Sequence, residues 1–126
     1  MSEKPYKRVV IGVAGTGSEH LAQQQAVATA ACVKCSVLAI HVLQPGEAPA
    51  PDLWDYLQAQ CARWQVPLQV RVIDGNPAEE LNAEAAATDM VVIGTKRLGK
   101  KFHLGMVAEQ VIRQSAGTVH VVRLDG

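Results

Sequence analysis

Five short apolar runs, rich in β-branched residues, alternate along this chain with stretches whose apolar residues recur at helical spacing. The runs occupy residues 8–14, 35–43, 68–73, 90–93 and 118–124. The second run is almost entirely apolar, which predicts a strand buried on both faces, whereas the third alternates as a strand near a sheet edge does. Because right-handed crossovers leave such a chain few other arrangements, the pattern predicts an α/β fold: an open parallel sheet with helices on both faces.

Helix signals separate these runs. Ser18 follows a glycine-containing turn as a predicted N-cap, and the series Asn76, Pro77 and Glu79 predicts a capped helix that continues to about Ala87. Three further apolar faces are predicted to pack on the sheet. They comprise Ala22, Ala26, Ala30 and Val33, then Leu53, Trp54, Leu57, Cys61 and Trp64, and finally Val107, Ala108, Val111, Ile112 and Ser115.

Length and charge restrict the class of protein. With 126 residues, 48% hydrophobic residues and a formal net charge of zero, we expect one domain that spans residues 1–126. A neutral chain lacks the long-range positive field of generic nucleic-acid or membrane-surface binders, so neither partner is expected. Residues 1–7 hold no apolar leader, and no run approaches the length of a membrane span, so we expect a cytoplasmic protein.

Basic residues cluster behind the fourth run. Gly94 ends an apolar strand and Gly105 precedes a predicted helix, an arrangement in which backbone N–H groups and a helix N-terminus can hold a phosphate. The predicted anion loop between them contains Lys96, Arg97, Lys100, Lys101 and His103. Charge-assisted bonds from such groups contribute about 1.5–3 kcal/mol each when well placed. The alternatives are a solvated loop, or an Arg97 side chain that fills the phosphate space and blocks ATP.

Six segments occur in an order that carries a family resemblance. They are the strand that opens at Val9, the strand end at residues 40–42, and the segments 75–81, 87–95, 105–109 and 119–122. Together they resemble the landmarks of the universal stress protein family, over essentially the whole chain. The resemblance implies a five-stranded parallel sheet of order 3-2-1-4-5, the adenine-nucleotide alpha-hydrolase-like fold, in proteins that are usually dimeric and of which some bind ATP.

The chain departs from the motif of the ATP-binding members, which is Gly-x-x-Gly, nine residues, then Gly followed by Ser or Thr. Gly94 is present, but Arg97 stands at the second glycine, and only seven residues separate it from Gly105. Met106 replaces the hydroxyl residue. Ala14 stands where the family commonly has an aspartate near the nucleotide. These departures predict weak or absent ATP binding.

The candidate pocket for a nucleotide or anion follows from the same motifs. Its predicted residues are Ala14, Val42, Ile93, Gly94, Thr95, Arg97, Gly105 and Met106. We interpret the chain as a dimeric regulatory or protective module of the stress response, without a catalytic residue. The alternative is an ATP-binding, weakly hydrolysing nucleotide switch. The sequence assigns no definite cofactor and leaves ATP or another phosphate-containing ligand as the candidate class. No metal site is predicted because the four histidines lie on different elements.

Two further motifs are weaker. Residues 15–17 begin like a dinucleotide fingerprint, but His20 occupies the third glycine position, so nicotinamide or flavin binding is not expected. Cys32 and Cys35 have redox spacing, yet they close a predicted helix, whereas active motifs open one, where the helix dipole stabilises a thiolate. A thiol redox protein is a third, less favoured interpretation.

The last run is the predicted dimer contact. In the order 3-2-1-4-5 it lies at a sheet edge, and only residues 125–126 follow it. An uncovered apolar edge favours pairing with a second copy across a two-fold axis. The predicted contact residues of the homodimer are Val119, His120, Val121 and Val122.

Overall fold

Strands and helices alternate strictly, as the sequence predicts. The computed structural model describes residues 5–15, 19–95 and 106–124. The strands are β1 (Arg8–Gly12), β2 (Ser36–Leu43), β3 (Leu68–Asp74), β4 (Met90–Thr95) and β5 (Thr118–Arg123). The helices are α1 (His20–Val33), α2 (Asp55–Trp64), α3 (Pro77–Glu84) and α4 (Met106–Gln114).

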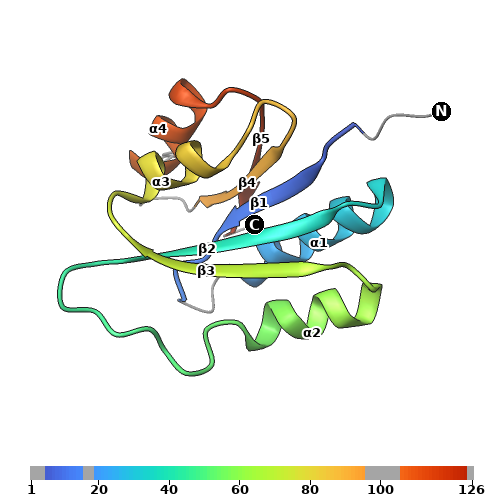
Figure 1. The fold of residues 1–126 in the computed structure, drawn as a ribbon, viewed down its shortest axis with the longest axis horizontal. Coiled ribbons are helices and arrows are strands. Elements are labelled where there is room, and N and C mark those ends of the chain that lie inside the picture. Colours follow the sequence, from blue (N-terminus) through green and yellow to red (C-terminus); the bar gives the residue numbers. More distant parts are fainter. Residues whose placement is uncertain (1–4, 16–18, 96–105, 125–126) are drawn as a thin grey trace.

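The sheet has the order β3-β2-β1-β4-β5, and every strand pair in it is parallel (Figure 1). This confirms the predicted sheet and its order 3-2-1-4-5. Helices α1 and α2 cover one face, and α3 and α4 cover the other. In the central strand β1, Ile11 pairs with Ala39 of β2 and with Val92 of β4. The chain therefore moves outward from β1 to β3 and then crosses back to β4.

Side chains of β1 alternate between two apolar layers. Val9 and Ile11 lie in the layer that contains Leu57 of α2, whereas Val10 lies in the opposite layer with Leu81 of α3. Burying one such side chain stabilises the fold by about 1.5–3 kcal/mol. Because both faces of the central strands are covered, these strands need hydrophobic residues at consecutive positions. This explains the continuous apolar run that forms β2.

Helix α1 presents its small residues to the sheet. It begins at His20, directly after Glu19 at the N-cap position. The predicted N-cap, Ser18, lies outside the described residues. The predicted face is buried at Ala22, Ala26 and Ala30.

Helix α3 begins as predicted but ends earlier. The Asn76 side chain accepts a hydrogen bond from the Glu79 N–H at 3.1 Å, and Pro77 is the first helical residue. The helix ends at Glu84 instead of near Ala87. The predicted helix length is therefore wrong by about one turn.

The early end of α3 has a tertiary cause. The Asp89 carboxylate accepts hydrogen bonds from the Ala86 N–H and from Arg8 Nε, each at 2.9 Å. Arg8 Nη2 in turn donates to the Glu84 carbonyl at 2.6 Å. These bonds satisfy backbone groups that would otherwise continue the helical ladder. The ion pair thus fastens the start of β1 to the loop between α3 and β4.

Three predicted core positions are exposed. Trp64 is 53% exposed, Ile112 42% and Val107 39%. Trp64 is the last residue of α2, and the Arg63 guanidinium carbon lies 5.3 Å from its ring centroid. Helix α4 buries a narrower stripe than its apolar spacing predicts, because only the positions in direct contact with the sheet are covered.

Candidate functional site

A cavity of about 300 Å³ opens at the carboxyl ends of β1, β2 and β4. Ligands of open parallel sheets bind at this edge, at the point where the strand order reverses. That point lies at β1 here, because β2 and β4 flank it on opposite sides. A volume of roughly 300 Å³ is the lower limit of typical small-molecule pockets. The position and the size fit a small organic ligand.

The cavity brings together four of the residues predicted for the nucleotide pocket. They are Ala14 behind β1, Val42 of β2, and Ile93 and Gly94 of β4. Thr95 is buried but does not line the cavity. Met106 is the first residue of α4, and the structure does not describe its side chain. The other predicted pocket and anion-loop residues lie outside the described residues, namely Lys96, Arg97, Lys100, Lys101, His103 and Gly105.

Gly94 has a packing role at this cavity. A Cβ atom on Gly94 would lie 2.7 Å from Leu124 Cδ1, so a side chain would have to push Leu124 aside. A Cβ on Gly12 would similarly lie 3.1 Å from Leu81 Cδ1. Leu81 and Leu124 both line the cavity. The two glycines therefore let these leucines form its walls.

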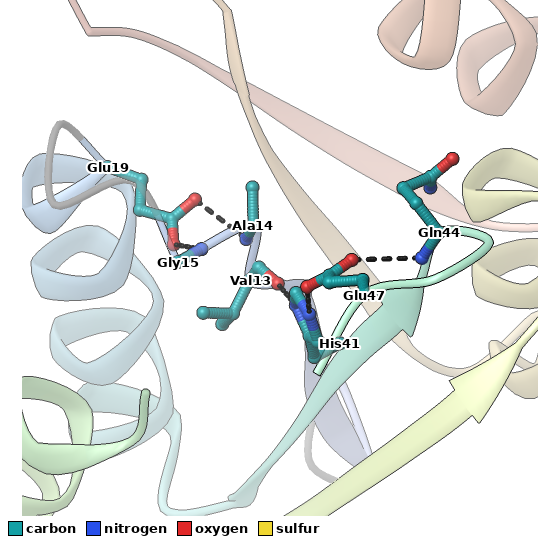
Figure 2. Close-up of polar contacts among 7 residues, drawn as sticks. All are labelled: Val13, Ala14, Gly15, Glu19, His41, Gln44 and Glu47. Carbon is teal, nitrogen blue, oxygen red and sulfur yellow. Dashed lines mark hydrogen bonds and ion pairs between the residues drawn. The ribbon is translucent and has the colours of Figure 1, made fainter. Parts of the chain in front are cut away.

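The carboxylate of Glu19 occupies the turn between β1 and α1 (Figure 2). It accepts hydrogen bonds from the Ala14 N–H and the Gly15 N–H, each at 2.9 Å, and the residue is only 8% exposed. Gly15 has a φ of +85°, a conformation that favours glycine. The N-terminal end of α1 stabilises the negative charge. Glu19 therefore fills a pair of backbone donors that could otherwise hold an anion.

The imidazole of His41 joins three segments at the same edge (Figure 2). Its Nδ1 lies 2.6 Å from the Val13 carbonyl oxygen, and its Nε2 lies 2.6 Å from Glu47 Oε2. Glu47 also accepts a hydrogen bond from the Gln44 N–H at 2.9 Å. Both ring nitrogens therefore face oxygen atoms of neighbouring segments, one of the backbone and one of a carboxylate.

The environment of Glu47 keeps its carboxylate ionised. The Gln44 N–H and, after it, the hydrogen bond to His41 hold the pKa of Glu47 below its ordinary value. His41 itself is buried within the end of β2. The ion pair thus ties the segment after β2 to the end of β1 across the cavity edge.

Sequence reasoning did not place Glu19, His41 or Glu47 in the site. Each had a signal: Glu19 is a carboxylate at a helix start, and His41 is the one ionisable residue of a largely apolar strand. Glu47 lies in the loop behind the carboxyl end of that strand. None of these signals shows that the three side chains meet at one cavity.

Few of the side chains in the described lining are polar. Its polar side chains are two carboxylates, one imidazole and the amide of Gln44, and the rest is apolar or glycine. Across residues 5–15, 19–95 and 106–124, no group of three or more His, Cys, Asp or Glu side chains is placed to hold a metal ion. The described lining includes no Ser, Thr, Cys or Lys that could act as a nucleophile.

The cysteines lie away from this cavity. Cys32 is exposed in the last turn of α1, whereas Cys35 and Cys61 are buried, and no disulfide joins the three. Burial raises the pKa of the Cys61 thiol. Cys32 and Cys35 lie at the end of α1 whose dipole disfavours a thiolate. The two cysteines therefore lie where the sequence predicts, at the C-terminal end of a helix.

The predicted dimer residues lie on β5, an edge strand of the sheet. Val119, His120 and Val121 are partly buried, and Val122 is buried. Val119 packs on the layer beneath α3 and α4, whereas Val122 belongs to the opposite layer. Both faces of this strand thus contribute to the core, and its outer edge pairs with no other described strand.

Comparison with protein-family models matches residues 5–123 to the universal stress protein family. The chain belongs to the universal stress protein family. The match spans all the described strands and helices, which confirms the predicted resemblance. A search of curated proteins gives no match.

Solved universal stress proteins share the fold. One, in complex with cAMP, is 25% identical with a TM-score of 0.77, and the alignment covers 94% of this chain and 98% of that one. Another, from Archaeoglobus fulgidus, is 20% identical with a TM-score of 0.76, covering 92% and 98%. A third, from Archaeoglobus fulgidus in complex with dAMP, is 18% identical with a TM-score of 0.69, covering 92% and 97%. The adenine-nucleotide alpha-hydrolase-like fold expected for this universal stress protein is thus confirmed.

Proposed function

We propose that this universal stress protein is a dimeric regulatory or protective module that binds a nucleotide with few phosphates and binds ATP weakly. The observation that carries the proposal is the cavity of about 300 Å³ at the carboxyl ends of β1, β2 and β4. Its position is that of nucleotide sites in open parallel sheets. Relatives solved with cAMP and with dAMP support a ligand of this class.

The charge of the described lining supports weak ATP binding. Glu19 and Glu47 contribute carboxylates, and no Lys or Arg lines the described part of the cavity. A triphosphate needs several charge-assisted bonds, each of about 1.5–3 kcal/mol. The altered motif at Arg97 and Met106, together with Ala14 at the end of β1, supports the same conclusion.

The proposed dimer uses β5. Two copies of this edge strand, related by a two-fold axis, would run antiparallel and satisfy each other's backbone groups. The proposal includes the cytoplasmic location expected from the sequence. Within the described residues, the helices are all too short or too polar to cross a membrane.

Mass spectrometry of small molecules released by denaturing the purified protein tests the ligand class. We expect a nucleoside monophosphate or a cyclic nucleotide to be released in a fixed ratio to protein. Release of ATP in that ratio would instead establish the alternative, an ATP-binding nucleotide switch. A released ligand without a nucleobase would contradict both interpretations.

A further inference from the structure

A smaller cavity of about 100 Å³, here called the second cavity, lies between the start of α1 and the start of α2. Among the residues that the structure describes, Glu19 is the only one that also lines the larger cavity. Because about 10–15 Å³ already holds one water molecule, the second cavity has room for a group of several atoms. Its side-chain lining consists of Glu19, His20 and Gln23 from one helix start and Asp52, Leu53 and Tyr56 from the other.

Gln23 carries a buried acceptor in this lining. The residue is 3% exposed, and within the described part of the chain its Oε1 has no hydrogen-bond partner. Its Nε2 lies 3.5 Å from Glu19 Oε1, which identifies the nitrogen end of the amide, because an amide oxygen there would face a carboxylate. A buried polar atom without a partner is destabilising. A hydrogen-bond donor bound in the cavity that Gln23 lines would therefore be stabilised by Oε1.

The charge of the second cavity favours a cation. Glu19 and Asp52 contribute carboxylates, and no Lys or Arg belongs to its described lining. The oxygens of Glu19 already accept hydrogen bonds, so this residue acts through its charge. Glu19 and Gln23 are buried, whereas His20 and Asp52 are exposed, so the cavity has a buried base and an open mouth. A positively charged donor suits both ends.

Aromatic side chains form one wall of this cavity. The rings of His20 and Tyr56 stack with their centroids 3.7 Å apart and their planes 7° from parallel. One turn further along α1, the Gln24 side-chain amide donates a hydrogen bond to the Tyr56 hydroxyl. These contacts join the start of α1 to the start of α2, so the wall needs no ligand to form it. Aromatic rings attract organic ammonium groups electrostatically.

We propose that the second cavity binds the primary ammonium group of a small alkylamine, which donates to Gln23 Oε1 and lies near the carboxylate of Asp52. An ammonium group has three N–H donors and no acceptor, which matches this lining. A divalent metal ion fits less well, because no described group of three or more His, Cys, Asp or Glu side chains is placed to hold one. The inference goes beyond the proposed nucleotide binding and does not depend on it.

An NMR titration of the whole protein with n-propylamine hydrochloride tests the site. The side-chain amide signal of Gln23 should shift saturably in the millimolar range, because the amine binds the oxygen of that amide. Potassium chloride at equal concentrations is the control for ionic strength and for an inorganic cation. It should leave the Gln23 signal unchanged.

Substitutions in the lining test which residues bind the amine. Gln23→Met keeps the size of the side chain but removes the buried acceptor, so it should weaken binding, followed at the Leu53 backbone amide, by about 10-fold or more. Asp52→Asn removes an exposed charge and should weaken binding by about 3-fold. The matched controls are Gln25→Met on α1 and Asp55→Asn on α2, exposed changes outside the lining that should bind as wild type does.

The inference is wrong if n-propylamine causes no saturable shift, as expected when an ordered water alone satisfies Gln23 Oε1. It is also wrong if potassium chloride shifts the Gln23 signal equally, or if either folded lining variant keeps the wild-type affinity. Thermal melting of each variant without amine establishes that it is folded. If Gln23→Met does not fold, Asp52→Asn and its control Asp55→Asn decide. None of these results bears on nucleotide release from the larger cavity, so the two proposals fail separately.

Discussion

His41 Nε2 lies 2.6 Å from Glu47 Oε2, so an ion pair joins the end of β2 to the segment that follows it. Through the Val13 carbonyl, the same imidazole also contacts the residue after β1. Side-chain contacts therefore connect the segments at the cavity edge, in addition to the backbone hydrogen bonds of the sheet.

This ion pair predicts a pH dependence of stability. The pKa of Glu47 is below its ordinary value of 4.5, chiefly through the Gln44 N–H and then through His41. The folded state therefore binds fewer protons at Glu47 than the unfolded chain does. Its stabilising contribution is complete above the unfolded value and is lost as pH falls through the folded value.

Urea unfolding of wild type and Glu47→Gln at a series of pH values checks this prediction. Wild type should be the more stable at neutral pH, and the difference should shrink as pH falls below about 4.5. A difference that stays constant down to pH 3 would show that Glu47 contributes nothing through its charge.

The Arg8–Asp89 pair should be a major contributor to stability. Asp89 has a side chain that is only 2% exposed and bonds both Arg8 and the Ala86 N–H. The Arg8 side chain is 31% exposed, so the pair is only partly buried, and Asp89→Ala also leaves the Ala86 N–H without its partner; the substitution should lower the free energy of unfolding by about 2 kcal/mol.

The exposed pair on α4 is the control for this prediction. Glu109 and Arg113 form an i, i+4 pair whose side chains are 52% and 74% exposed. Glu109→Ala should cost less than about 1 kcal/mol, because surface pairs contribute little. Equal losses in the two variants would contradict the structural role of Asp89.

The thiols should differ in reactivity. Cys32 is exposed, whereas Cys35 and Cys61 are buried and burial raises the pKa of Cys61. Because the thiolate is the reactive form, iodoacetamide at neutral pH should modify Cys32 first. Peptide mass spectrometry checks the order. A reversible Cys32–Cys35 disulfide formed under mild oxidant would instead support the thiol redox interpretation.

The proposed dimer predicts a concentration-dependent mass. Light scattering should give a dimer for wild type at tens of micromolar, and Val121→Pro should weaken it because proline removes a ladder donor. Val70→Pro on β3, the opposite edge strand, is the matched control and should remain dimeric. Circular dichroism identifies any variant that fails to fold. A monomeric wild type, or a folded and dimeric Val121→Pro, would contradict pairing through β5.

The fold was predictable because its signals are local or periodic. The apolar run that forms β2 reports burial on both faces, and Asn76 with Pro77 marks the start of α3 within a few residues. The early end of α3 was not predictable, because its cause is a contact between Arg8 and Asp89, which are 81 positions apart.

Some residues of the candidate site were likewise predictable from the sequence, and others were not. Ala14, Val42, Ile93 and Gly94 were found through motifs at strand ends, where the sheet topology brings them together. Glu19 and Glu47 escaped prediction because their roles depend on the direction of a side chain across a turn and on a histidine in a neighbouring segment. Residue pattern alone does not encode those directions.

Titration calorimetry with AMP, cAMP and magnesium-ATP tests the central claim most directly. The small cavity and its two carboxylates predict that AMP or cAMP binds at least about 10-fold more tightly than magnesium-ATP, a difference of about 1.4 kcal/mol. A dissociation constant for magnesium-ATP below about 10 μM, equivalent to roughly 7 kcal/mol, would contradict the account and establish an ATP-binding switch.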